Sequence, residues 1–124
     1  MEIETVKELG LVDYFSILYD IVQFCRRSHI KVGPGRGSGG GSFFLYLLGI
    51  TEIAPLVHGL LFERFLSRSR KDMADFDLDV DANQRDKVLE YAKQRWGALP
   101  IANFATYGNP MLIRDLGRLY HVPM

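Results

Sequence analysis

Six glycines fall within the nine residues from Gly33 to Gly41, in the stretch KVGPGRGSGGGS, and an apolar run that reads FFLYLL follows directly. Ordering a glycine costs more conformational entropy than ordering any other residue, so a glycine run that folds must gain something from its missing side chains. A collagen-like chain would need glycine at every third position, and a flexible linker would not need Arg36 in its midst. The run therefore predicts a loop whose backbone lies close to another group, most often a phosphate.

The well-known glycine-rich phosphate loops fit this stretch only in part. The range 35–40 spells G-x-G-x-x-G, but a Rossmann fold would place an acid after a second strand about twenty residues later, where this chain reads as helix. A Walker A loop would need a lysine, and none lies between Lys31 and Lys71; the lysine strand and catalytic loop of a protein kinase are missing as well. The features that these phosphate loops share are still present: glycines let the backbone approach an anion, Ser38 offers a hydroxyl, and a helix start follows. A surface loop without a ligand is the alternative.

The stretch DFDLDVD alternates aspartate with apolar residues. In a strand, alternate side chains share a face, which would gather the aspartates on one side and the apolar residues on the other. Like charges on one face repel, and divalent cations would relieve that repulsion. A calcium-binding EF-hand is excluded, because Val80 stands where its loop needs glycine and Asp86 where it needs glutamate. A solvated acidic strand without metal is the alternative.

A basic cluster comes directly before the acidic one, although the chain as a whole has 15 basic and 15 acidic residues and no net charge. The basic members are Arg64, Arg68, Arg70 and Lys71, and the acidic members are Asp72, Asp75, Asp77, Asp79 and Asp81. This arrangement suits an anionic substrate bridged by metal ions better than a long nucleic-acid-binding face. Strand carboxylates that face a glycine–serine loop at a helix start are the layout of two-metal nucleotidyl transfer.

Periodicity and capping residues predict one domain of α/β (α+β) class, over residues 1–124. We expect helices at 11–28, 42–48, 59–68, 82–96 and 109–120, and strands at 30–32, 73–80 and 100–107. Asp81 is the expected N-cap of the fourth helix, with Gln84 at the capping-box position, and Gly97 is its expected end. The single cysteine, Cys25, excludes an internal disulfide, and its apolar helical surroundings predict buried packing in a cytoplasmic protein. No apolar run approaches the roughly 18 residues of a membrane span.

Several of these motifs together resemble one family. In order, they are GPGRGSGGGS, LGITEIAPL, GLLFERFL, DFDLDVD, RDKVLEYAKQRWG and FATYG with IRDLGRLY. The chain resembles, over residues 10 to 120, the N-terminal half of the palm in the bacterial DNA polymerase III alpha subunits, the family C replicative polymerases. The resemblance implies a partial nucleotidyltransferase palm like that of DNA polymerase beta, a small sheet flanked by helices. Its glycine–serine loop would be 33–42 and its carboxylate strand 73–80.

The resemblance also implies roles for particular residues. Asp75 and Asp77 would be catalytic aspartates that bind Mg²⁺, and Asp79 would be a third acid of the same motif. The residues implied to contact the triphosphate of the incoming nucleotide are Arg36, Gly37, Ser38 and Arg64. The chain departs from the family where Ala74 replaces a proline and where Gly39 and Gly40 replace the usual pair of alanines.

The implied function is two-metal transfer of a nucleotidyl group from a dNTP to a primer 3′ hydroxyl in a bacterial or phage replication protein. The implied partners are dNTP, primer–template DNA and the remainder of a polymerase III alpha subunit or other replisome components, with no membrane. The family's third catalytic aspartate would lie beyond Met124, so we expect the chain alone to be inactive. Two alternatives stay open: a non-catalytic module that binds nucleotide–Mg²⁺ or a polymerase, and a truncated gene product.

Overall fold

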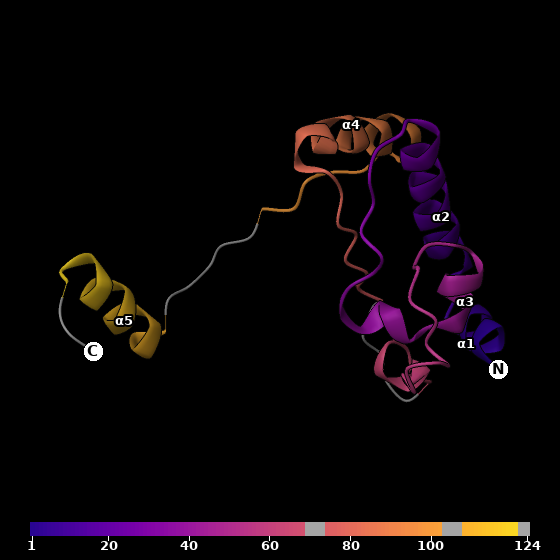
Figure 1. The fold of residues 1–124 in the computed structure, drawn as a ribbon, viewed down its shortest axis with the longest axis horizontal. Coiled ribbons are helices and arrows are strands. Elements are labelled where there is room, and N and C mark those ends of the chain that lie inside the picture. The colour runs from indigo at the N-terminus through magenta and orange to yellow at the C-terminus, as the bar shows by residue number, and fades with distance from the viewer. Residues whose placement is uncertain (69–73, 103–107, 122–124) are drawn as a thin grey trace.

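The computed structural model describes residues 1–68, 74–102 and 108–121. Five α-helices occur in this part of the chain: α1 (Glu2–Glu8), α2 (Val12–Arg27), α3 (Phe43–Leu47), α4 (Arg85–Trp96) and α5 (Asn109–Leu119). Short 3₁₀ turns occupy Gly37–Gly41, Phe62–Arg64 and Ala82–Gln84. In Figure 1 the first four helices form one body, and α5 stands apart from it. No helix in the described ranges is both long and apolar enough to cross a membrane.

The main core forms where α1, α2 and α3 meet the residues after the 3₁₀ turn Phe62–Arg64. Phe15 of α2 lies at its centre and meets the rings of Phe44 and Phe65 edge to face, at centroid distances of 5.9 and 6.0 Å. The buried members of this core are Val6, Phe15, Val22, Leu45, Ile50, Phe65 and Leu66. The helix predicted at 11–28 is therefore confirmed, and its apolar positions pack as the spacing predicts.

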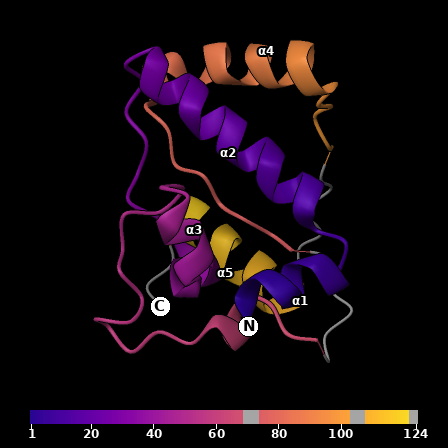
Figure 2. The ribbon, with the colours of Figure 1, turned by 90° about the vertical axis from the view of Figure 1, so that its right-hand side faces the viewer.

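A second, smaller core joins α2 to α4, which crosses the C-terminal end of α2 in Figure 2. Cys25 is fully buried there, as predicted, and burial raises the pKa of its thiol. The rings of Phe24 and Tyr91 stack at 3.9 Å, and Asp20 accepts hydrogen bonds from Tyr91 Oη (2.7 Å) and Trp96 Nε1 (2.9 Å). The hydrogen bond from Tyr91 is the main cause that lowers the pKa of Asp20.

The predicted α/β fold with a small palm sheet is wrong for the described residues, which are mostly helical and contain no strand or sheet. The predicted strands 30–32 and 73–80 meet only in an isolated antiparallel bridge between Val32 and Val80. Gly33 N donates to Asp79 O (2.9 Å), and Asp81 N donates to Lys31 O (3.0 Å). Beyond these two bonds the backbones separate, so the segments are extended without forming a ladder.

The other predicted helices and strands agree with the structure to different degrees. The helix predicted at 59–68 reduces to the 3₁₀ turn Phe62–Arg64, and most of the strand predicted at 100–107 lies outside the described residues, as does residue 73. The helix predicted at 82–96 is present as the 3₁₀ turn Ala82–Gln84 followed by α4, and Gly97 is left-handed at the end of α4. Asp81 caps the 3₁₀ turn, where it accepts from Asn83 N (2.9 Å), whereas the N-cap of α4 is Gln84. The capping box does not form, because the N–H of Asp81 donates to Lys31 instead. The last helix is confirmed as α5, with Pro110 in its first turn.

The N-terminal helix α1, which was not predicted, fixes the start of α3. Its Glu2 carboxylate accepts from Ser42 Oγ (2.9 Å), Phe43 N (3.1 Å) and Phe44 N (2.9 Å). These backbone N–H groups have no partner within the helix, so an acidic side chain at this position satisfies them and favours the helix dipole. Ser42 Oγ accepts in turn from Leu45 N (3.2 Å). A contact between residues 40 positions apart thus holds the first helix against the third.

Replacing Glu2 with alanine should lower the free energy of unfolding by about 1–3 kcal/mol, because three donors lose a charged acceptor. The matched control is Glu4→Ala on the same helix; this carboxylate is exposed and, among the described residues, pairs only with the N-terminal ammonium, at 3.1 Å. The control should change stability by less than about 0.5 kcal/mol. Urea denaturation followed by circular dichroism measures both variants. Equal effects would contradict the assigned role of Glu2.

Candidate functional site

The glycine loop lies directly against the extended carboxylate segment 74–80, and the missing side chains make that approach possible. A Cβ atom added to Gly39 would lie 2.5 Å from the ring of Phe76. One added to Gly33 would lie 3.0 Å from Asp79 Cβ, and one added to Gly37 would lie 3.4 Å from Asp77 Oδ2. Glycine at these three positions therefore lets a loop pack on the acidic segment at distances that a side chain would prevent or crowd.

A fourth glycine brings the 3₁₀ turn Phe62–Arg64 to the other side of the loop. A Cβ atom on Gly41 would lie 2.7 Å from the carbonyl oxygen of Leu61. The turn that carries Arg64 consequently packs beside the 3₁₀ turn Gly37–Gly41, which carries Ser38. Arg64 and Ser38 are both exposed, and Arg64 forms no ion pair within the described ranges. The structure thus places these two predicted triphosphate-contacting residues on neighbouring turns.

The predicted alternation of faces along the carboxylate segment is confirmed without a sheet. Asp75, Asp77 and Asp79 are exposed, whereas the residues between them are partly buried. Ala74, Phe76 and Leu78 pack against the main core, and Val80 packs against the second core. Apolar contacts on one face therefore direct the three aspartates to the other face, where Asp77 and Asp79 lie beside the glycine loop.

Arg36 lies between the glycines of the loop and pairs with two of the three aspartates. Its Nη2 lies 3.1 Å from Asp77 Oδ1, and its Nε lies 3.5 Å from Asp79 Oδ1. The flanking residues Gly35 and Gly37 have φ values of +120° and +67°, which residues with a side chain rarely adopt. The sequence placed Arg36 with the phosphate-contacting residues and did not predict that it would contact the acids.

Tyr14 is a further residue at this site that the sequence did not reveal. Burial raises the pKa of its phenol most, the nearby Asp75 and Asp77 carboxylates raise it further, and a hydrogen bond with the Phe76 backbone lowers it. Tyr14 thus lies close to the Phe76 backbone and to the Asp75 and Asp77 carboxylates. Its position on a helical apolar stripe gave no signal of this contact.

The helix start after the loop, which was predicted to bind a phosphate, binds a carboxylate of the chain itself. The N–H groups of Phe43 and Phe44 already donate to the Glu2 carboxylate. An anion is therefore bound there, and it belongs to the chain itself. Gly37 and Ser38 at the start of the 3₁₀ turn, and the two arginines beside it, are exposed and remain accessible to a phosphate.

The described residues do not form a complete metal site. Among residues 1–68, 74–102 and 108–121, no three His, Cys, Asp or Glu side chains gather closely enough to hold a metal ion. Two of the three predicted acidic ligands pair with Arg36 instead. Three further members of the predicted charged clusters, Arg70, Lys71 and Asp72, lie outside the described residues.

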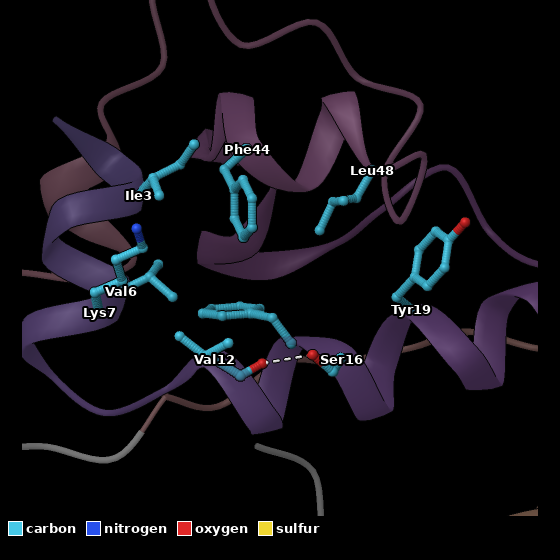
Figure 3. Close-up of a pocket in the computed structure, with 9 residues that line it drawn as sticks. Ile3, Val6, Lys7, Val12, Ser16, Tyr19, Phe44 and Leu48 are labelled. Carbon is cyan, nitrogen blue, oxygen red and sulfur yellow. Dashed lines mark hydrogen bonds between the residues drawn. The ribbon is translucent and has the colours of Figure 1, made fainter.

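The cavity between α1, α2 and α3 is not part of this site. It has a volume of about 330 Å³ and is lined mainly by apolar side chains, among them Ile3, Val12, Phe44 and Leu48 (Figure 3). Ser16 lies at its wall, where its hydroxyl donates to Val12 O (2.9 Å). Lys7 is the one charged residue of this lining, which contains no residue of the glycine loop or of the carboxylate segment.

Comparison with known proteins identifies the family. The model of the bacterial DNA polymerase III alpha NTPase domain matches residues 1–124. The DNA polymerase III subunits alpha of Aquifex aeolicus and Bacillus subtilis are 39% and 40% identical to the chain, each over 98% of it and 11% of the relative. That of Mycobacterium tuberculosis is 41% identical over 97% of the chain and 10% of the relative. The chain therefore belongs to the bacterial DNA polymerase III alpha family and spans about a tenth of the length of these relatives.

Replacing Gly39 with alanine should lower the free energy of unfolding by about 1–3 kcal/mol, because the new methyl group would overlap the Phe76 ring. Gly40→Ala is the matched control in the same turn, since its Cβ would meet only Ile53 Cδ1, at 3.8 Å. It should change stability by less than about 0.5 kcal/mol. Denaturant unfolding measures both.

A double-mutant cycle separates this overlap from a backbone effect. In a Phe76→Val background the ring is gone, so Gly39→Ala should cost less than it does in the parent chain. The expected coupling is about 1 kcal/mol or more. An identical cost of Gly39→Ala in both backgrounds would refute the contact.

Proposed function

We propose that this chain supplies part of the active site of a DNA-directed DNA polymerase, which transfers a nucleotidyl group from a dNTP to a primer 3′ hydroxyl. One observation carries the proposal: the glycine loop holds Arg36 within 3.1–3.5 Å of the Asp77 and Asp79 carboxylates. A cationic loop and an acidic segment in contact provide both kinds of group that a nucleotide–metal complex needs. Family membership supports the same function.

In this proposal the loop and its neighbouring turn hold the triphosphate. Gly37 lets the backbone approach the phosphates, Ser38 donates from its exposed hydroxyl, and Arg36 and Arg64 donate charged N–H groups from two sides. The two arginines come from separate segments, which the close packing of Gly41 on Leu61 brings together. An arginine binds phosphate oxygens with a planar fork of donors, so two of them also orient the triphosphate.

Asp75 and Asp77 are the proposed Mg²⁺ ligands, with Asp79 as an additional acidic group. Their carboxylate oxygens are the hard ligands that Mg²⁺ prefers. Bound Mg²⁺ would lower the pKa of the attacking hydroxyl and stabilise charge on the phosphoryl group. Because no three acidic ligands gather within the described residues, we propose that a group outside them completes the coordination.

The proposed partners are dNTP, primer–template DNA and the remainder of a polymerase III alpha subunit or other replisome components. The alternative is a non-catalytic module that binds nucleotide–Mg²⁺ or a polymerase. The contact of Arg36 with the acids is compatible with this alternative as well. Both functions share the triphosphate and metal contacts, and turnover distinguishes them.

The aspartates can be tested by metal binding. Asp75→Asn and Asp77→Asn should each abolish millimolar-range binding of Mg²⁺ or Mn²⁺ and leave the fold intact, because both side chains are exposed and their loss relieves repulsion. Isothermal titration calorimetry measures the binding, and circular dichroism checks the fold. Unchanged metal binding by the double variant would rule out the proposed ligands.

The loop can be tested by nucleotide binding. Arg36→Ala and Arg64→Ala should each weaken dNTP binding by about 1–3 kcal/mol, the scale of one charge-assisted hydrogen bond, and Ser38→Ala should cost less. Chemical shift changes on dNTP addition should cluster at residues 33–42 and 64. Shift changes that cluster elsewhere would show that the triphosphate binds another surface.

Primer extension tests catalysis. Displacement of reacting groups by about an ångström can cost 10²-fold in rate, so an incompletely ligated metal pair should give no measurable synthesis. We expect none from the purified 124-residue chain. Template-dependent extension that Asp77→Asn eliminates would show instead that the chain is a self-sufficient polymerase.

A further inference from the structure

Arg36 pairs with two of the three carboxylates that the proposed function assigns to metal binding. Its Nη2 contacts Asp77 Oδ1 and its Nε contacts Asp79 Oδ1. One planar group can pair with two carboxylates at once because its donors are spread along a fork. A divalent cation held by Asp77 or Asp79 would repel the guanidinium, so the two cations compete for these carboxylates.

The ion pairs of Arg36 with Asp77 and Asp79 are exposed, so another cation can replace the guanidinium. The side chains of Arg36, Asp77 and Asp79 are 57%, 49% and 58% exposed, so water and ions reach all three. Exposed ion pairs are weak, and a divalent cation carries twice the charge. Apart from these two ion pairs, no ion pair holds the guanidinium in the described residues. The exposed Ser38 and the neighbouring turn that carries Arg64 provide a second position for an anion close to the loop.

We propose that Arg36 is an internal counter-ion, which a divalent cation displaces from Asp77 and which then binds the triphosphate. This inference rests on the proposed function and adds a regulatory consequence to it. Without ligand, the arginine neutralises the acids. Each ligand removes the competitor of the other, because metal frees Arg36 for phosphate and phosphate frees Asp77 for metal. Metal and triphosphate thus bind with positive cooperativity.

The first test is Mn²⁺ binding in the absence of nucleotide, measured by electron paramagnetic resonance. Arg36→Gln should raise the Mn²⁺ affinity about three- to tenfold, because the competing cation is gone. Arg36→Lys, which keeps the charge, should stay closer to the parent chain. The matched control is Arg68→Gln, which removes the same charge from an ion pair with Glu8 at 2.8 Å. The control should change the affinity by less than about twofold.

The second test is the reciprocal one, with inorganic tripolyphosphate as the probe and a chelator present to remove metal. Asp77→Asn should raise the tripolyphosphate affinity, because it frees Arg36. Asp75→Asn removes the same charge from the same face, and no ion pair joins Asp75 to Arg36 in the described residues. The gain in Asp77→Asn should exceed that in Asp75→Asn by about threefold or more.

The outcomes separate this inference from the proposed function. One outcome would refute the counter-ion role alone. In it, the parent chain binds Mn²⁺ and Asp77→Asn abolishes that binding, but Arg36→Gln leaves the Mn²⁺ affinity unchanged or lower. The proposed metal ligands would then stand without the counter-ion role. Equal gains of tripolyphosphate affinity in Asp75→Asn and Asp77→Asn would likewise overturn it. Failure of every variant and of the parent chain to bind Mn²⁺ would overturn both.

Discussion

The close approach of the glycine loop to the carboxylate segment is the contact on which the rest of the site depends. Three glycines pack against Phe76, Asp77 and Asp79 at distances that leave little or no room for a side chain. That approach places Arg36 on the acids, and the packing of Gly41 on Leu61 adds the Arg64 turn. A residue larger than glycine at these positions would separate the cationic and acidic groups that the proposed function requires together.

Side chains from distant segments hold the carboxylate segment where a sheet was expected. One antiparallel bridge joins it to Val32, the Tyr14 phenol lies near its backbone at Phe76, and its apolar face packs on two cores. The loop is fixed at its far end by Glu2, which binds the start of α3 across 40 residues of sequence. The groups of the candidate site thus rest on long-range contacts from α1 and α2 and on core packing.

The sequence predicted features that local patterns determine. Helical spacing located α2 and α4, Gly97 adopted the expected left-handed conformation, and period-two alternation assigned the faces of Asp75 and Asp77. The prediction of a sheet was wrong because an extended segment becomes a strand only when another segment pairs with it, and alternation of residues does not reveal such a partner. The contacts of Glu2, Tyr14 and Arg36 were missed for a related reason. Each joins residues far apart in sequence, and no spacing rule reveals such a pair.

The contact between the loop and the carboxylate segment can be measured directly in solution. In nuclear Overhauser spectra of the isotope-labelled chain, we predict cross peaks between the Hα protons of Gly39 and the ring protons of Phe76. We also predict an Hα–Hα cross peak between Val32 and Val80, because facing residues of such a bridge bring these protons together. Absence of both, with the Phe76 ring in contact with other residues, would show that the loop does not pack on the acidic segment.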